Sequence, residues 1–190
     1  MRSLVVTENI TLDGVIDAAG DWFAPSGTDE ATDIAEMLAV ERGLREAAGA
    51  LLVGRETFEA FRGYWPLQTD DPTGVSDYLN RVEKYVVSST LDDPAWGRSH
   101  VLRGPLVDDV TALKSAPGKD IVCTGSISLV HALTAARLVD EYRLFVYPVV
   151  VGRGRRLFPE GQDAGPLQLV QAHAFRSGIV LMRYRTGAGT

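Results

Sequence analysis

Short apolar runs alternate with amphipathic segments over the first 140 residues of the chain. Residues 4–7, 50–53, 84–88, 100–102 and 121–123 are β-branched or continuously apolar, which is typical of strands, several of them buried on both faces. Between them, residues 29–48, 55–62, 106–115 and 127–138 have the spacing of helices, and Thr28 or Asp29 can cap the first. This alternation predicts parallel βα units.

After residue 140 the pattern changes to strands that follow strands. Residues 142–151 form a long strand pattern that Pro148 interrupts, which indicates a sheet edge or a bulge. Residues 167–175 and 179–185 flank Ser177-Gly178 and predict a hairpin. The expected fold is a three-layer α/β/α sandwich: a mixed, mostly parallel sheet with helices on both faces and a C-terminal antiparallel hairpin. Because no linker or repeat divides residues 1–190, we expect a single domain.

Composition narrows the class of protein. The 190 residues carry 19 Lys and Arg against 25 Asp and Glu, a net charge of −6, which argues against a nucleic-acid or anionic-membrane binder. No apolar run approaches the roughly 18 residues of a membrane span. The single cysteine, Cys123, is compatible with a cytoplasmic location, and three scattered histidines predict no metal site.

Three strand ends carry the candidate chemistry. The first runs into Gly54-Arg55-Glu56-Thr57, the second into Ser88-Ser89-Thr90, and the third into Thr124-Gly125-Ser126-Ile127. Carboxyl ends of parallel strands share one edge of the sheet, and helix N-termini there offer free N–H groups to anions. Each segment alone is explained as a tight turn, but the three together favour an anionic ligand such as a nucleotide. Neither the G-x-G-x-x-G fingerprint nor a P-loop is present.

Longer blocks of sequence resemble a known family. They are M-R-S-L-V-V-T with T-L-D-G-V, L-L-V-G-R-E-T-F-E-A-F-x-G-Y-W-P, K-Y-V-V-S-S-T-L-D-D-P-x-W, and T-G-S-I-S-L-V with L-V-D-E-Y-R-L-F-V-Y-P-V-V-V-G-x-G-x-x-L-F. In their order and spacing they are similar to the dihydrofolate-reductase-like family. The closer resemblance is to its bacterial branch, related to the C-terminal reductase domain of the bifunctional riboflavin biosynthesis protein.

The resemblance implies an NADPH site along the three strand ends. Gly54, Arg55 and Thr57 match the turn that holds the cofactor phosphates. Ser88 and Ser89, with Thr90 beside them, match the hydroxyl pair at the ribose and its 2′-phosphate. Gly125, Ser126 and Ile127 occupy the turn under the pyrophosphate, where the family is richer in glycine and where a branched side chain at Ile127 can crowd the cofactor.

No residue stands out as the catalytic acid. Dihydrofolate reductases place a carboxylate on the first helix, but no motif selects among Asp29, Glu30, Asp33 and Glu36, each of which is otherwise a solvated surface charge. Asp13, before Gly14, is a weak candidate for catalysis or substrate binding, and an ordinary turn-forming aspartate is the alternative.

Aromatic residues are candidates for stacking on a flat substrate. Trp22 and Phe61 are equally compatible with a substrate pocket and with the core or a dimer contact, whereas Tyr64 and Trp65 favour the latter. Tyr147 faces the expected cleft or packs in the core.

The leading hypothesis is therefore an NADPH-dependent reductase of a small, flat nitrogen heterocycle, pterin-like or ribosylaminopyrimidine-like. The alternative is a non-enzymatic ligand-binding or scaffold protein that keeps the fold with weakened cofactor binding. The four consecutive apolar residues 179–182 place the last strand near a sheet edge, where an exposed face invites a partner. Together with the resemblance, this predicts a homodimer that buries residues 142–151 and 179–185.

Overall fold

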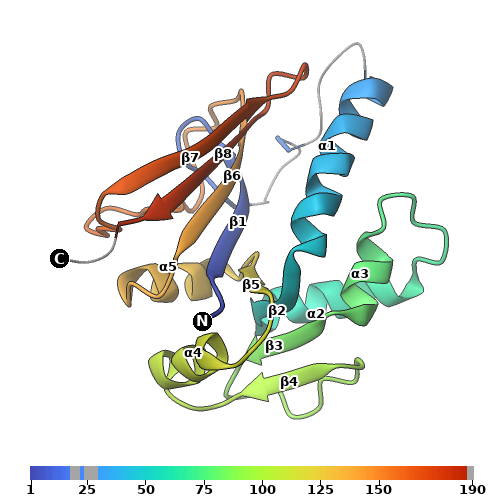
Figure 1. The fold of residues 1–190 in the computed structure, drawn as a ribbon, viewed down its shortest axis with the longest axis vertical. Coiled ribbons are helices and arrows are strands. Elements are labelled where there is room, and N and C mark those ends of the chain that lie inside the picture. The colour runs from blue at the N-terminus through green and yellow to red at the C-terminus, as the bar shows by residue number, and fades with distance from the viewer. Residues whose placement is uncertain (18–21, 24–29, 188–190) are drawn as a thin grey trace.

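One eight-stranded sheet organises the chain (Figure 1). The computed structural model describes residues 1–17, 22–23 and 30–187. The strands are β1 (Leu4–Thr11), β2 (Ala48–Gly54), β3 (Glu83–Val87), β4 (Ser99–Leu102), β5 (Asp120–Cys123), β6 (Glu141–Tyr147), β7 (Leu167–Ala174) and β8 (Val180–Thr186). The helices are α1 (Glu30–Glu46), α2 (Arg55–Tyr64), α3 (Val75–Arg81), α4 (Leu106–Ser115) and α5 (Ile127–Ala135), with a short 3-10 helix at Trp65–Leu67.

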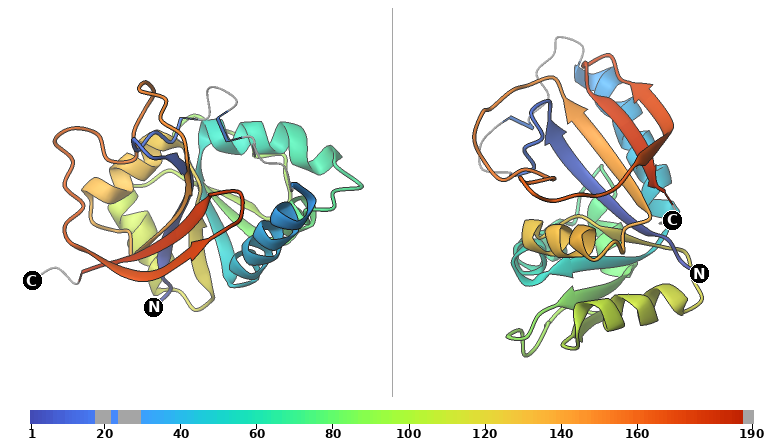
Figure 2. Two further views of the ribbon diagram at one scale, coloured as in Figure 1. Left: turned by 90° about the horizontal axis from the view of Figure 1, so that it is seen from above. Right: turned by 90° about the vertical axis from the view of Figure 1, so that its left-hand side faces the viewer.

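The strand order confirms the predicted fold class. The order is β4-β3-β2-β5-β1-β6-β8-β7, in which β1 to β6 run parallel and β8 runs antiparallel to both of its neighbours, β6 and β7. In the left view of Figure 2, α1 and α2 lie on one side of the sheet and α4 and α5 on the other. The layers are therefore helix, sheet and helix, as the alternating pattern predicts.

The two faces of the sheet have separate cores. Leu4, Val6 and Ile10 of β1 pack with residues of α4 and α5, including Val110 and Leu133. On the opposite face, one cluster joins α2 and α3 to β2 and β3, and another joins α1 to β6 and β8. Alternation along β1 therefore assigns its even positions to the α4 and α5 side.

The prediction of an edge or bulge at Pro148 is wrong. Strand β6 ends at Tyr147 and lies inside the sheet, paired with β1 and β8. A proline has no N–H to donate to a ladder, so the strand stops before it.

The last strand lies near a sheet edge, as expected, but its apolar residues are not exposed there. Strand β8 is covered on its outer side by β7, and Ile179 and Leu181 are almost fully buried in the core under α1. The hairpin itself is confirmed: Gly178 at its turn has φ +84°. The sequence missed helix α3, because its seven residues are too short for a clear period.

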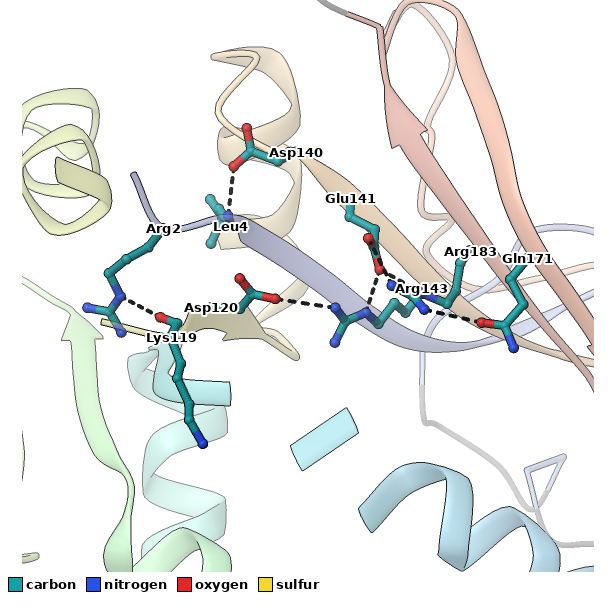
Figure 3. Close-up of polar contacts among 9 residues, drawn as sticks. All are labelled: Arg2, Leu4, Lys119, Asp120, Asp140, Glu141, Arg143, Gln171 and Arg183. Carbon is teal, nitrogen blue, oxygen red and sulfur yellow. Dashed lines mark hydrogen bonds and ion pairs between the residues drawn. The ribbon is translucent and has the colours of Figure 1, made fainter. Parts of the chain in front are cut away.

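A buried ion-pair network ties the two halves of the sheet together (Figure 3). Arg143 donates from Nε to Oε1 of Glu141 at 2.6 Å, and its Nη2 lies 3.5 Å from Oδ2 of Asp120 on β5. Arg183 of β8 donates to both oxygens of Glu141, at 2.9 and 3.2 Å. Burial acts to raise the pKa of Glu141, but the bonds from Arg183 and Arg143 outweigh it and hold that pKa below its usual value.

Strand β1 is paired unequally on its two sides. It pairs with β5 only from Leu4 to Val6, but with β6 from Val5 to Thr11. The second half of β1 therefore has no neighbour on the β5 side, and the sheet opens there. No helix in the described part of the chain is long and apolar enough to cross a membrane.

Candidate functional site

A cavity of about 570 Å³ lies where the sheet opens, within the usual range for a small-molecule site. Its walls come from β1, β5, β6, α1, α2, α3 and the loop from Thr124 to Ile127. It therefore combines the carboxyl edge of the parallel strands with the face of the sheet that α1 covers.

Two strand-to-helix turns meet at the mouth of the cavity. The N–H of Gly54 donates to the carbonyl oxygen of Gly125 at 3.2 Å. A Cβ on Gly54 would overlap the Ser126 hydroxyl and lie 3.1 Å from its Cβ. Gly125 has φ +113°, and a Cβ there would lie 2.8 Å from Oγ1 of Thr57. The positive φ of Gly125 favours glycine there, and at Gly54 an added Cβ fits only if Ser126 shifts.

These turns present two helix N-termini together. Helix α2 begins at Arg55 and α5 at Ile127, and neither N-cap residue, Gly54 or Ser126, makes a side-chain capping bond. The first N–H groups of a helix have no partner within it and carry its positive dipole end. The pair of turns therefore suits an anionic group such as a pyrophosphate, and Thr57, Gly125, Ser126 and Ile127 all line the cavity.

The other residues predicted to hold the cofactor lie outside the cavity lining, at the ends of β2 and β3. Arg55 is 44% exposed and forms an ion pair with Glu59 at 2.9 Å. Ser88 accepts hydrogen bonds from the N–H groups of Thr90 and Leu91.

Sequence reasoning missed a further cation beside the two serines. Arg103, directly after β4, donates to the carbonyl oxygens of Ser89 and Leu91. This places a second guanidinium near the predicted 2′-phosphate position, on the same edge of the sheet as Arg55. In the sequence, the only sign of this second cation is an arginine directly after a short predicted strand.

Asp13 has the geometry of a turn residue. Its carboxylate accepts from the Thr11 hydroxyl at 2.6 Å and from the N–H groups of Val151 and Gly152 at 3.3 and 2.8 Å. The Thr11 bond above all holds the pKa of Asp13 below its usual value. Asp13 is absent from the cavity lining, and it fixes the loop after β6 as an ionised acceptor. These contacts favour the turn-forming alternative.

The aromatic candidates divide between the cavity and the core. Trp22, Phe61 and Trp65 line the cavity. For Trp65, the sequence had favoured a core or dimer contact. Tyr147 is only 6% exposed and meets the Trp22 ring edge-on at 5.5 Å. Tyr147 therefore packs against Trp22 and does not itself line the cavity. Tyr64 is 55% exposed and lies outside the lining.

Among the side chains that the structure describes, none of the carboxylates expected on the first helix lines the cavity. Asp29 and the side chains of Glu30 and Asp33 lie outside the described residues. Glu36 is exposed and bonds His173 at 3.1 Å. The helix does contribute Glu41, five residues after Glu36, which lines the cavity beside Arg45, and burial raises its pKa. Nothing in the sequence pattern of this helix distinguishes Glu41 from its other carboxylates.

Glu8 is the main functional candidate that the sequence missed. It lies in the second half of β1, lines the cavity, and its Oε1 is buried without a hydrogen-bond partner. Burial raises the pKa of this carboxyl to about 8, so that it is mostly uncharged at neutral pH. The only sign of it in the sequence is a glutamate directly after the apolar residues of the first strand.

Metal ligation has no support in the described residues: among residues 1–17, 22–23 and 30–187, no three His, Cys, Asp or Glu side chains group as a metal site would require.

The fold and the cavity define a class: α/β proteins that bind a ligand at the carboxyl edge of a mainly parallel sheet. The model of the RibD C-terminal domain family matches residues 2–181, so the chain belongs to that family. A curated relative, the uncharacterized protein YyaP of Bacillus subtilis (strain 168), is 29% identical over 189 residues, which cover 96% of this chain and 94% of that one.

Solved structures share the fold at low identity. A structure described as a riboflavin biosynthesis protein of Shewanella sp. PV-4 superposes with a TM-score of 0.74 at 19% identity, covering 98% of this chain and 99% of the other. A pyrimidine reductase-like protein of Corynebacterium diphtheriae NCTC gives 0.64 at 16% identity, over 99% and 93% of the two chains. These likenesses confirm the fold.

The contact between the two turns predicts a sharp effect of Gly54→Ala. The added methyl group collides with Ser126, so we expect a loss of about 1–3 kcal/mol in the free energy of unfolding, measured by urea denaturation. The double variant Gly54→Ala/Ser126→Gly should recover most of it. Gly63→Ala is the matched control, because a Cβ at that position in α2 meets nothing within 4 Å. Equal stability of Gly54→Ala and Gly63→Ala would contradict the assignment.

The raised pKa of Glu8 predicts a pH-dependent effect of Glu8→Gln. The unfolded chain ionises this group near pH 4.5 and the folded chain only near pH 8, so its contribution to stability is complete below pH 4.5 and is lost as pH rises through 8. The glutamine variant escapes this loss. We expect it to match the wild type below pH 4.5 and to exceed it by about 5 kcal/mol well above pH 8, by urea denaturation. The exposed Glu160→Gln serves as control, and a pH-independent difference would refute the shift.

Proposed function

We propose that this protein is an NADPH-dependent reductase of a small, flat nitrogen heterocycle, either pterin-like or ribosylaminopyrimidine-like. The observation that carries the proposal is the meeting of two uncapped helix N-termini at the mouth of a cavity that also has aromatic walls and a buried acid. Family membership supports it, as does the likeness to a pyrimidine reductase-like protein.

The residues present fit NADPH in a defined direction. Its pyrophosphate would bind at the N-termini of α2 and α5, where the contact between Gly54 and Gly125 keeps the backbone free of side chains. The adenosine 2′-phosphate would then lie toward the ends of β3 and β4, near Ser89 and Arg103. The nicotinamide end would enter the cavity and, when bound, supply the hydride.

The cavity would hold the acceptor ring against the nicotinamide. Trp22 and Phe61 offer faces and edges for stacking, and Trp22 is held by a hydrogen bond from its Nε1–H to the carbonyl oxygen of Asp17 at 2.9 Å. Helix α1 contributes Glu41, Leu44 and Arg45 to the inner wall of the cavity. The protein would thus orient two flat rings and exclude water from them.

The non-enzymatic alternative rests on Ile127. This side chain lines the cavity at the first position of α5, and it also packs against the core shared with α4 and α5. Its core contact gives it a structural role in either case, and the buried Glu8 favours the reductase. Catalytic turnover of NADPH in the presence of a ribosylaminopyrimidine would separate the two functions.

We also propose a homodimer, with its interface on β7 rather than on residues 142–151 and 179–185, because Phe145, Ile179 and Leu181 of those segments are buried in the chain's own core. Strand β7 forms one edge of the sheet and exposes Leu169 and Val170, which are 53% and 42% accessible. Such an edge invites symmetric pairing with a second copy. Light scattering at micromolar concentration should give twice the 20.6 kDa of one chain, and Leu169→Lys should lower it without unfolding the protein. A mass of one chain for the wild type would contradict the dimer.

The proposed cofactor predicts a preference for NADPH over NADH. Arg55 and Arg103 provide guanidinium groups on the edge where the 2′-phosphate would lie, and each charge-assisted bond contributes roughly 1.5–3 kcal/mol. Isothermal titration calorimetry should show tighter binding of NADPH, and Arg55→Ala and Arg103→Ala should each weaken it about 10- to 100-fold while leaving NADH binding unchanged. Arg176→Ala, exposed near the distant hairpin turn, is the control. Equal affinity of the wild type for both nucleotides would refute the proposal.

A further inference from the structure

Glu8 occupies an unusual position in the sheet. The other even positions of the strand, Leu4, Val6 and Ile10, pack in the core shared with α4 and α5. Val6 pairs with Cys123, the last residue of β5. Glu8 comes two residues later in β1, beyond the end of that neighbouring strand. A carboxylate at Glu8 would raise the pKa of the Cys123 thiol, because the two groups are close enough to interact. Glu8 therefore lies beside the segment that leads into Gly125. Glu8 is one of the residues that line the cavity, and we infer that its side chain faces the gap that the end of β5 leaves beside β1.

Within the described part of the chain, Oε1 of this carboxyl is buried without a hydrogen-bond partner, and desolvation is the cause of its raised pKa. By contrast, Glu41, another acid of the cavity lining, forms an ion pair with Arg45. A buried polar atom left unpaired costs about 1–3 kcal/mol, which a purely structural residue would avoid.

The gap also lies where reduction would take place. Glu8 lines the same cavity as Gly125 to Ile127, the proposed pyrophosphate site, and as the aromatic residues Trp22 and Phe61. A nicotinamide that extends from the first toward the second passes this carboxyl.

We propose that Glu8 is the proton donor of the reaction: a carboxylic acid held neutral in the cavity until hydride transfer creates an anion next to it. This inference rests on the proposed reductase function. The reduced nicotinamide gives its hydride to the carbon of a C=N or C=O bond, the π electrons move to the nitrogen or oxygen, and the Glu8 O–H gives its proton to that atom. The products are the oxidised nicotinamide, the amine or alcohol, and a Glu8 carboxylate, which takes a proton from water before the next cycle.

The protonation state of Glu8 is measured first, without any ligand. The infrared difference between the wild type and Glu8→Gln at pH 7 should contain the band of a buried protonated carboxyl, and this difference band should disappear as the pH rises through about 8. The exposed Glu160→Gln should keep the band. A wild type without this band at pH 7 overturns the inference, whatever the cofactor.

Cofactor binding then tests the position of the acid. Oxidised nicotinamide is positively charged, so NADP⁺ beside Glu8 should ionise it. Calorimetry at pH 7 in two buffers of different ionisation enthalpy should show release of nearly one proton on NADP⁺ binding to the wild type, and almost none with NADPH or with Glu8→Gln. Binding of both nucleotides without this proton release overturns the inference alone. Absence of binding to the wild type overturns the reductase function, and the proton donor with it.

Turnover gives the final measurement, with NADPH and a ribosylaminopyrimidine as the probe. The single-turnover rate should fall about tenfold per pH unit above pH 8 in the wild type. Glu8→Gln should be about 10²- to 10⁴-fold slower, should lose this limb of the pH profile and should keep the affinity for NADPH. A variant with the wild-type rate and pH profile overturns the role of Glu8.

Discussion

The unequal pairing of β1 is the constraint on which the site depends. Strand β5 accompanies β1 for three residues and then turns away at Gly125, whereas β6 accompanies it to Thr11. A sheet that closed along its full length would bury the second half of β1 between two neighbours and leave no cavity. The early end of β5 instead produces, at one place, the gap, the free N-terminus of α5 and the exposure of Glu8 to the cavity. Figure 1 shows this divergence at the centre of the molecule.

The surroundings of this opening are rigid for identifiable reasons. On one side, the turns at Gly54 and Gly125 touch through a backbone hydrogen bond, and neither accommodates a Cβ without a shift of its neighbour. On the other, the network around Glu141 connects β5, β6 and β8 beneath the cavity (Figure 3). A buried ion pair is weak evidence for stability, since desolvation offsets most of its attraction. Its better-supported effect here is to hold Arg143, a cavity residue, in one orientation.

Two acids on the neighbouring strands β1 and β6 have opposite pKa shifts. Glu141 accepts hydrogen bonds from two arginines, which keep its pKa low, whereas no ion pair to Glu8 is found among the described residues and burial raises its pKa. The same residue type, glutamate, therefore serves as a fixed anion at position 141 and as a protonated acid at position 8. Environment alone separates the two roles. Asp13 belongs with the first kind, because its bonds to Thr11 and the loop after β6 leave it no proton to give.

Local sequence was sufficient for the elements and their class. Continuous apolar runs and helical spacing depend only on neighbouring residues, so the alternation of strands and helices, the final hairpin and the glycine turns at Gly54 and Gly125 were all readable from the chain. Strand order was not, because pairing depends on contacts between distant segments. For that reason the sequence placed the hairpin near an edge without showing that β7 covers β8, and Pro148 was interpreted as an edge or bulge signal although an interior strand ends before it.

The chemistry of the site was decided by the tertiary structure. In sequence, Glu8 is a polar interruption in an apolar strand and Arg103 a charged residue after one. Only the packing of β5 against half of β1 removes water and partners from Glu8, and only the parallel order of β2, β3 and β4 brings Arg103 to the same edge as Arg55. A pKa depends on burial and on nearby charges, both of which are properties of the folded chain. The sequence by itself determined which chemical groups the protein has; the fold determined which of them are buried, which are paired, and which is left with a proton to donate.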